Sequence, residues 1–347
     1  MSLLEVNDLE MRFPLAGSRK VVQAVNGVSL TLEKGKTLSL VGESGSGKTT
    51  IGRCVLGLLE PSGGVVTFAG ERIGGSRTIR SPSLRGRMQL VFQEPAESLD
   101  PRIRVGDSIA EPLRILKVNR ADRDKRVREV ARRVGLSEAM LHAYPGELSA
   151  GQQQRVGIGR AIVTRPELIV LDEPTSALDP TARSEIIDLL IRLQGELETA
   201  YLFISHDLST VRYLSHRVAV LYLGMIVEEA DAAALFSEPR HPYSIGLLSS
   251  VLLPDPTLKV EPGVALAGEI PSPIDLPKGC FLASRCPYAD DHTRTHMPPV
   301  TMAGKDHSVR CFKHEQIAAR ERGIDNFAVF QANVERTLRP EMTLNDT

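Results

Sequence analysis

Apolar residues along this chain recur with two periods, which predict strands in alternation with helices. Residues 28–32 alternate apolar and hydroxyl side chains, the period of a half-buried strand, and we expect an antiparallel sheet near the start of the chain. Residues 168–171 form a continuous apolar run, typical of a strand buried on both faces of a parallel sheet. Further strands are expected at 37–41, 201–204 and 218–223. Helical spacing relates two further sets of residues, namely Ile51, Cys54, Val55, Leu58 and Leu59, and Ile186, Leu189, Leu190 and Leu193.

Two stretches depart from this alternation and set the expected domain boundaries. From about residue 95 to residue 160 the chain is charged and helical in pattern, as an inserted helical subdomain would be. Residues 239–299 are dense in proline, which long helices and central strands do not tolerate. We therefore expect an α/β core at 1–236, with an antiparallel β subdomain and the helical insertion, followed by a small proline-rich C-terminal extension at 237–347.

Charge and composition narrow the class of protein. The chain has 42 Lys and Arg against 43 Asp and Glu, so its overall charge does not favour nucleic acid as a partner. The longest apolar runs, such as residues 218–223, fall far short of the roughly 20 residues that cross a bilayer. Four cysteines without a secretion signal argue against a disulfide framework. We expect a cytoplasmic chain that reaches a membrane only through protein partners.

A phosphate-binding loop is the strongest chemical signal. Residues 42–49 fit the P-loop pattern G-x-x-x-x-G-K-[ST] between a predicted strand and a predicted helix. Glycines let successive backbone N–H groups point into one concavity, and the helix dipole adds positive potential. Lys48 would reach the β- and γ-phosphates and Thr49 would ligate Mg²⁺. The alternative is a tight glycine turn without ligand. The predicted nucleotide-binding residues are Gly42, Ser44, Gly45, Ser46, Gly47, Lys48, Thr49 and Thr50.

Two acidic residues follow the buried run at 168–171. Carboxyl ends of parallel strands are where open α/β sheets bind ligands. Asp172 is predicted to bind Mg²⁺, and Glu173 to polarise the water that attacks the γ-phosphate. An Asp-Glu pair at a strand end can also be a solvated terminus, but its position after a P-loop favours function.

Residues 148–152, Leu-Ser-Ala-Gly-Gln, resemble the signature sequence L-S-G-G-Q of ABC ATPases. In that family the signature binds the γ-phosphate of ATP held by the opposite subunit, which implies this role for Ser149, Gly151 and Gln152. Ala150 departs from the family's glycine, and its methyl group is tolerable unless the backbone there needs a positive φ. Closure of the dimer could be weaker as a result.

The resemblance extends over about residues 3 to 230 and implies further roles. Phe13 matches the ring that stacks on adenine, although a lone Phe is more often a core residue. Gln93 matches the glutamine that contacts Mg²⁺ and the attacking water, and Asp179 lies in a match to the D-loop. His206 matches the switch histidine at the γ-phosphate. The resemblance implies ATP hydrolysis in a head-to-tail dimer that traps two ATP.

Several short stretches of the chain carry a more specific resemblance, namely residues 41–48, 92–95, 98–102, 222–224, 241–243, 268–273 and 285–287. They resemble the oligopeptide and dipeptide importer branch of the family, in particular its second ATPase subunit. This resemblance implies import of peptides, with nickel, opines or oligosaccharides as alternative solutes. It also implies a related second ATPase as partner, with a homodimer as the alternative, two multi-span permease subunits and an external binding protein. The chain would then lie peripherally on the cytoplasmic face of the inner membrane.

Some members of this branch bind a [4Fe–4S] cluster through four cysteines of the extension. Cys280, Cys286 and Cys311 match three of them, but the position seven after Cys286 is Thr293, with His292 beside it. A cluster with a substitute ligand, a Zn²⁺ site that uses His292 or His307, and three reduced thiols stay open as alternatives.

ABC ATPases that move no solute are the main functional alternative. They predict two cassettes in one chain, a long coiled-coil insertion, or zinc modules with basic surfaces, and the sequence shows none of these. A regulatory subunit with an inactive site would lack one of the four residues Lys48, Asp172, Glu173 and His206, and all four are present.

Overall fold

The computed structural model describes residues 2–74, 82–94, 98–249 and 264–321. The expected start of the helical insertion at about residue 95 and parts of the extension, 250–263 and 322–347, lie outside these ranges. Within them no helix is long and apolar enough to cross a bilayer. All predicted site residues fall inside the described ranges, so their positions can be compared directly.

An antiparallel sheet opens the chain, as the alternation at 28–32 predicts. β1 (Ser2–Pro14) pairs with β2 (Val21–Glu33) on one side and β4 (Gly63–Phe68) on the other, and β5 (Glu71–Ile73) follows β4. Residues 28, 30 and 32 of β2 are buried while 29 and 31 are exposed. The sheet therefore has one face on the core and one in solvent.

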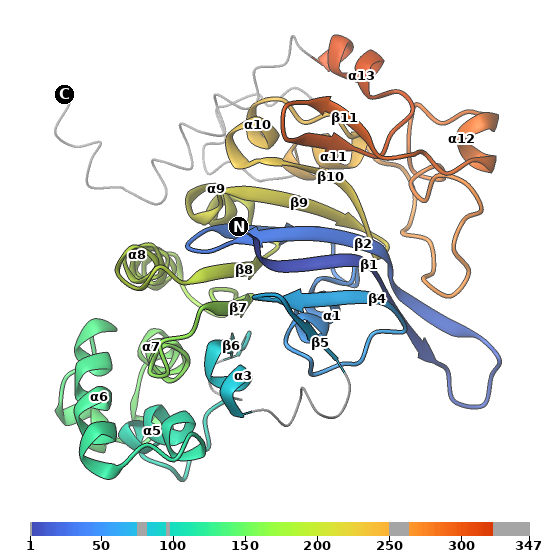
Figure 1. Ribbon diagram of the computed structural model, residues 1–347. Coiled ribbons are helices and arrows are strands. Elements are labelled where there is room, and N and C mark those ends of the chain that lie inside the picture. The colour runs from blue at the N-terminus through green and yellow to red at the C-terminus, as the bar shows by residue number, and fades with distance from the viewer. Residues whose placement is uncertain (1, 75–81, 95–97, 250–263, 322–347) are drawn as a thin grey trace, which may run out of the picture.

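The main sheet combines parallel strands with an antiparallel edge. Its order in the described part of the chain is β11-β12-β10-β9-β3-β8-β7-β6, and the run from β9 to β6 is parallel throughout. Parallel pairing brings the carboxyl ends of β3, β7 and β8 to the same edge of the sheet (Figure 1). The parallel strands are β3 (Thr37–Val41), β6 (Met88–Val91), β7 (Leu168–Asp172), β8 (Ala200–Ile204) and β9 (Arg217–Tyr222).

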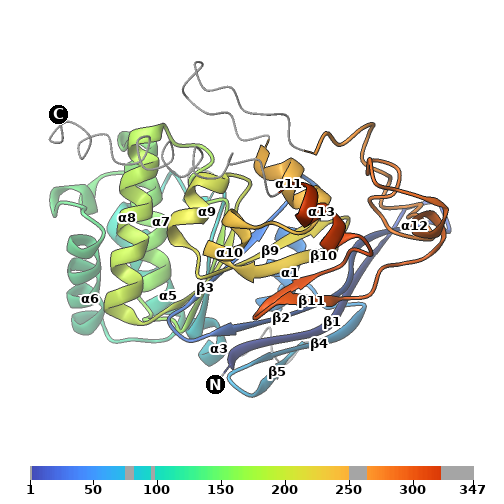
Figure 2. The same ribbon diagram turned by 90° about the horizontal axis from the view of Figure 1, so that it is seen from above.

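The helical insertion and the C-terminal extension lie at opposite ends of this sheet (Figures 1 and 2). The insertion lies beyond β6 and β7, whereas the extension lies beside β10 (Met225–Asp231). Helices of the core and insertion are α1 (Lys48–Val55), α3 (Pro82–Arg87), α5 (Val105–Ile115), α6 (Arg120–Arg133), α7 (Ala150–Ile162), α8 (Pro180–Leu197), α9 (Leu208–Leu214) and α10 (Ala232–Ser237). Those of the extension are α11 (Pro242–Ser249), α12 (Asp291–Thr295) and α13 (His314–Glu321).

Two apolar clusters hold these layers together. One fills the space between the main sheet, the insertion and α8, and the other lies between the antiparallel sheet, α1 and the opposite face of the main sheet. The predicted inner face of α8 is correct, since Ile186, Leu189, Leu190 and Leu193 are all buried. The prediction for α1 is wrong at Leu58, which is 54% exposed because the helix ends at Val55.

The extension continues the main sheet. β12 (His307–Val309) pairs with β10, and β11 (Thr301–Gly304) pairs with β12. The fully buried Glu228 of β10 ties the two parts together, because its carboxylate accepts backbone N–H bonds from Arg240 (2.6 Å) and His241 (2.9 Å) and lies 2.7 Å from His307 Nε2. A buried carboxylate of this kind is retained only where such partners satisfy it.

Replacing Glu228 by alanine is expected to lower the free energy of unfolding by roughly 3 kcal/mol, because buried N–H groups lose their acceptor. Chemical denaturation of Glu228→Ala beside Glu238→Ala measures the effect. Glu238 is the matched control, since its side chain is 64% exposed and forms an ion pair with Arg240. Equal unfolding midpoints for the two variants would contradict the anchoring role of Glu228.

Candidate functional site

The loop between β3 and α1 takes a conformation that only glycine permits at two positions. Gly42 has φ 147° and a Cβ there would lie 2.2 Å from the carbonyl oxygen of Leu221. Gly47 has φ 100° and a Cβ would lie 2.4 Å from the carbonyl oxygen of Ala24. The glycines of the motif therefore serve close backbone packing against β9 and β2 as well as the curl of the loop itself.

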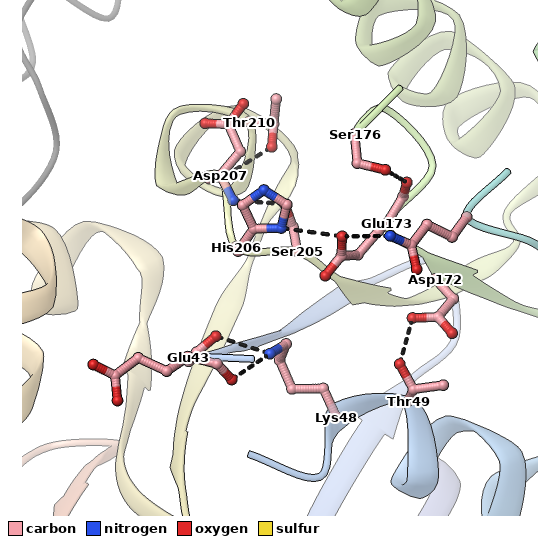
Figure 3. A network of polar contacts seen from close by, with 12 residues as sticks. Glu43, Lys48, Thr49, Asp172, Glu173, Ser176, Ser205, His206, Asp207 and Thr210 are labelled. Atoms are coloured by element: carbon pink, nitrogen blue, oxygen red, sulfur yellow. Dashed lines mark hydrogen bonds and ion pairs between the residues drawn. The ribbon is translucent and has the colours of Figure 1, made fainter. Parts of the chain in front are cut away.

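Lys48 begins α1 and its ammonium group bends back over the loop (Figure 3). Nζ donates to the carbonyl oxygens of Gly42 (2.8 Å) and Glu43 (3.0 Å) and to Ser46 Oγ (3.3 Å). The residue is 6% exposed, and this burial lowers the pKa of the ammonium, opposed by the nearby carboxylates. A cation held at a loop of backbone N–H groups is suited to bind phosphate oxygens.

Thr49 and Asp172 lie side by side across the sheet edge. Thr49 Oγ1 donates to Asp172 Oδ1 over 2.9 Å, so a hydroxyl oxygen and a carboxylate oxygen lie next to each other (Figure 3). Burial raises the pKa of Asp172, while the Thr49 bond acts in the opposite direction. Oxygen donors of this type fit Mg²⁺, which keeps several water ligands and is usually bound with substrate phosphates.

Glu173 is held in a left-handed backbone conformation, with φ 47°, which is unusual for a non-glycine residue. Its N–H donates to the carbonyl of Ile204 (2.9 Å), and its own carbonyl accepts from the hydroxyl of Ser176 (3.0 Å). These bonds fix the backbone so that the side chain turns back toward the loop after β8 (Figure 3). Such conformations persist where surrounding structure over-determines them, and they cluster at functional sites.

The Glu173 carboxylate is the meeting point of two other predicted residues. Gln93 Nε2 donates to Glu173 Oε2 (3.2 Å), and His206 Nδ1 lies 3.1 Å from the same oxygen. The three come from separate segments, after β6, β7 and β8. The structure thus brings together side chains that follow three different strands, and Gln93 and Glu173 are 80 residues apart in the chain. The parallel topology predicts this meeting, because it places the ends of these strands at one edge of the sheet.

A cavity of about 570 Å³ joins the P-loop to this group. It is large enough for a nucleotide's phosphate chain and open to solvent on one side. Ala24 of β2 is the lining residue that the sequence analysis missed, and no local sequence signal marks it. Phe13 is instead half-buried against the core of the antiparallel sheet and does not line this cavity. The lining residues are Ala24, Ser44, Gly45, Gly47, Lys48, Thr49, Thr50, Gln93, Glu173 and His206.

The signature residues lie apart from this cavity, at the start of α7. Ser149 caps the helix through a reciprocal pair of bonds, in which Gln152 N donates to Ser149 Oγ (3.3 Å) and Ser149 N donates to Gln152 Oε1 (2.9 Å). Ala150 is the first helical residue and has no positive φ, so its methyl group imposes no backbone strain. Asp179 caps α8 in a similar way, accepting from Ala182 N (2.9 Å). None of these residues lines the cavity with Lys48.

The three cysteines of the extension line a second, mostly apolar cavity together with Thr293. Burial raises the pKa of Cys311 to about 12 and also raises those of Cys280 and Cys286. The Thr293 hydroxyl is engaged in the cap of α12, where it donates to the Asp290 carbonyl and accepts from the Asp290 N–H, both over 2.8 Å. The cavity therefore offers three thiols, one fewer than the four that a [4Fe–4S] cluster takes.

The two histidines considered as substitute ligands have other partners. His292 stacks on His296 with ring centroids 4.4 Å apart, and His307 is bonded to the buried Glu228. Among the described residues, no three His, Cys, Asp or Glu side chains are grouped so that they could hold a metal ion. The donor set therefore does not fit a four-thiolate cluster or a zinc centre.

Comparisons with known proteins find similar sequences along nearly the whole chain. Residues 25–176 match the family described as ABC transporter, and residues 227–292 match the oligopeptide/dipeptide transporter C-terminal region. The chain is 41% identical to a probable peptide ABC transporter ATP-binding protein of Sinorhizobium fredii, over 99% of this chain and 98% of that protein. It is 40% identical to the oligopeptide transport ATP-binding protein OppF of Escherichia coli, over 90% and 96%.

Among solved structures, the chain resembles a dimeric ATP-binding cassette in a post-hydrolysis state, bound to ADP and Pi. The TM-score is 0.60 at 27% identity, and the match covers 66% of this chain and 98% of the other.

Proposed function

The chain belongs to the ATP-binding proteins of ABC transporters that carry the oligopeptide/dipeptide C-terminal region, and we propose that it hydrolyses ATP to power the import of peptides. The observation that carries this proposal is the cavity in which Lys48 of the P-loop faces Glu173, Gln93 and His206. Relatives named as peptide transport ATP-binding proteins that align over most of their length support peptides as the solute.

The residues of the P-loop and the group around Glu173 have proposed tasks. Lys48 and the N–H groups of the loop bind the β- and γ-phosphates, with Ser44, Gly45, Ser46, Gly47 and Thr50 beside them. Glu173 orients the attacking water and accepts its proton, because its carboxylate lines the cavity, whereas that of Asp172 is bonded to Thr49. His206 contacts the γ-phosphate and keeps Glu173 in place. Gln93 joins the site to the helical insertion and follows its movement.

Mg²⁺ is proposed to bind beside the phosphates through Thr49, Asp172 and Gln93. The paired oxygens of Thr49 and Asp172 support this assignment, because both are donors that Mg²⁺ prefers. When bound, the ion supplies positive charge to the phosphate oxygens. The cysteines Cys280, Cys286 and Cys311 are proposed to stay as reduced thiols in the apolar cavity of the extension.

The second half of each site is proposed to come from a partner subunit. Ser149, Gly151, Gln152 and Asp179 lie outside the cavity of their own chain, which supports their use across a head-to-tail dimer interface. The exposed helix start at Ser149 presents N–H groups that favour an anion. The proposed partner is a related but non-identical ATPase. Phe13 of this chain is proposed to stack on the adenine of the nucleotide.

The proposed membrane location and permease partners are inferred from the similarity to peptide transport ATP-binding proteins. We place the chain peripherally at the cytoplasmic face of the inner membrane, beneath two multi-span permease subunits that receive peptide from an external binding protein. The proposed domain division is an ATPase core at 1–236, with its helical insertion at about 95–160, and an extension at 237–347.

Purification of the tagged chain from detergent-solubilised membranes tests this assembly. We expect two multi-span subunits and a second, similar ATPase to co-purify and to be identified by mass spectrometry. An untagged strain and a tagged unrelated cytoplasmic ATPase serve as controls. Recovery of a soluble complex with nucleic acid or ribosomes would overturn the transport assignment and leave the ATPase chemistry intact.

A further inference from the structure

The extension contacts the P-loop at Glu43. Its carboxylate receives both guanidinium nitrogens of Arg285, Nη1 to Oε2 over 2.9 Å and Nη2 to Oε1 over 3.1 Å. Its backbone N–H donates to the hydroxyl of Tyr243 (2.8 Å), and its carbonyl accepts from Lys48 Nζ (3.0 Å). All polar groups of Glu43 are thus engaged, two of them by residues that come after the ATPase core.

Arg285 is itself held in place. Its side chain is 9% exposed, and its carbonyl accepts from the N–H of Ala267 (3.1 Å). The guanidinium carbon lies 5.8 Å from the ring centroid of Tyr222, whose ring in turn lies 4.8 Å from that of Tyr243. Hydrogen bonds to Glu43 raise the pKa of Arg285. A bidentate pair on a rigid, largely desolvated support fixes the geometry of both partners.

The charge of Glu43 makes this support consequential. A carboxylate in a loop that binds a triphosphate repels its ligand, and the repulsion is greater in a partly buried site than in water. In Figure 3 the Glu43 side chain points away from Lys48, toward the extension. Arg285 both neutralises this carboxylate and holds it in that direction, so the loop keeps its N–H groups and Lys48 for the nucleotide.

We propose that Arg285, supported by Tyr243, is a positioning residue for the P-loop, through which the C-terminal extension sets the affinity of the site for ATP. The inference rests on the proposed function, since it requires that the loop around Lys48 is the phosphate site. It gives the extension a role in the ATPase cycle itself, and it joins residues 242 positions apart.

Steady-state ATP hydrolysis by the assembled complex tests the proposal. Arg285→Ala is expected to raise the KM for MgATP about tenfold. We expect kcat to change by less than about threefold, because Arg285 touches none of the groups at Glu173. Arg285→Lys, which keeps the charge but loses the bidentate geometry, is expected to fall between wild type and Arg285→Ala.

The decisive comparison is the double variant Glu43→Gln with Arg285→Ala. If the loss comes from an uncompensated carboxylate beside the phosphates, the neutral amide should return the KM to within about threefold of wild type. Arg240→Ala is the matched control, an arginine of the extension that is 17% exposed and pairs with Glu238 away from the loop. Its KM should equal that of the wild type.

Two results would overturn the inference. One is an unchanged KM in Arg285→Ala, and the other is a double variant that is as impaired as Arg285→Ala alone. Thermal unfolding of each variant separates a lost fold from a lost affinity. Failure of the proposed function itself would look different, because the wild-type complex would then hydrolyse no ATP and Lys48→Ala would change nothing.

Discussion

Replacing Glu173 by glutamine is expected to lower ATP turnover by about 10²- to 10⁴-fold, the usual contribution of a general base. The amide keeps the size of the carboxylate and its place between Gln93 and His206 but cannot accept a proton from water. ATP binding should persist, because Lys48 and the loop are unchanged. Since the nucleotide is then trapped uncleaved, the variant should dimerise more tightly in MgATP, as size-exclusion chromatography with light scattering would show.

Glu198→Gln is a matched control for this substitution. Glu198 is a second glutamate with a left-handed backbone, φ 52° against 47° for Glu173, but it lies at the end of α8 and pairs with Lys34 at the surface. Its variant should hydrolyse ATP as the wild type does. Wild-type turnover in Glu173→Gln would remove Glu173 from the role of base and leave its strained backbone without a functional account.

Lys48→Ala is expected to lower kcat/KM for MgATP by about 10²- to 10³-fold or more, the cost of removing one preorganised charged donor from a phosphate site. The buried ammonium bonds to two loop carbonyls and Ser46 in the structure, so its removal affects both charge and loop order. Direct binding of a fluorescent ATP analogue should fall in parallel, because the loss concerns ground-state binding as well as catalysis.

Lys34→Ala controls for a general effect of removing a lysine. Lys34 is 58% exposed, and its ammonium group pairs with the carboxylate of Glu198 over 2.8 Å. Circular dichroism of both variants verifies that Lys48→Ala is folded. A folded Lys48→Ala protein with unchanged ATPase activity would refute the phosphate site at residues 42–49.

The sequence predicted the core strands well because their signals are local. Residues 37–41 and 168–171 coincide with β3 and β7, since buried parallel strands require uninterrupted apolar runs. The P-loop after β3 and the acidic pair at the end of β7 were predicted for the same reason, because each motif is adjacent in the chain to its strand. Solved ATP-binding cassettes with the same fold and the two family matches confirm the expected α/β class and family.

Features that depend on long-range packing were not predictable in this way. Apolar spacing alone extended α1 to Leu59, whereas Gly57, with φ 66°, follows the end of the helix and turns the chain. Short β11 and β12 carry too few residues to stand out, and only their pairing with β10 makes them strands of the main sheet. The composition of the extension marked it as different in kind but not as part of the same sheet.

The site shows the same division. Gln93, Glu173 and His206 could be assigned one by one from motifs, but their meeting at one carboxylate oxygen depends on strand order. Ala24 and Arg285 carry no motif that points to the P-loop, because each reaches it through tertiary contact alone. The roles given to the site residues, including Phe13 at adenine, stay predictions until variants are measured.

Peptide-stimulated ATP hydrolysis by the purified complex in liposomes tests the central claim most directly. The complex contains this chain, its partner ATPase and the permease subunits. The peptide-loaded binding protein is supplied on the side of the bilayer opposite the ATPase subunits. We predict that loaded binding protein raises ATP turnover, that peptide moves across the bilayer only with ATP, and that both effects disappear in Glu173→Gln. Hydrolysis without any response to the loaded binding protein, or peptide movement that survives in Glu173→Gln, would contradict the account.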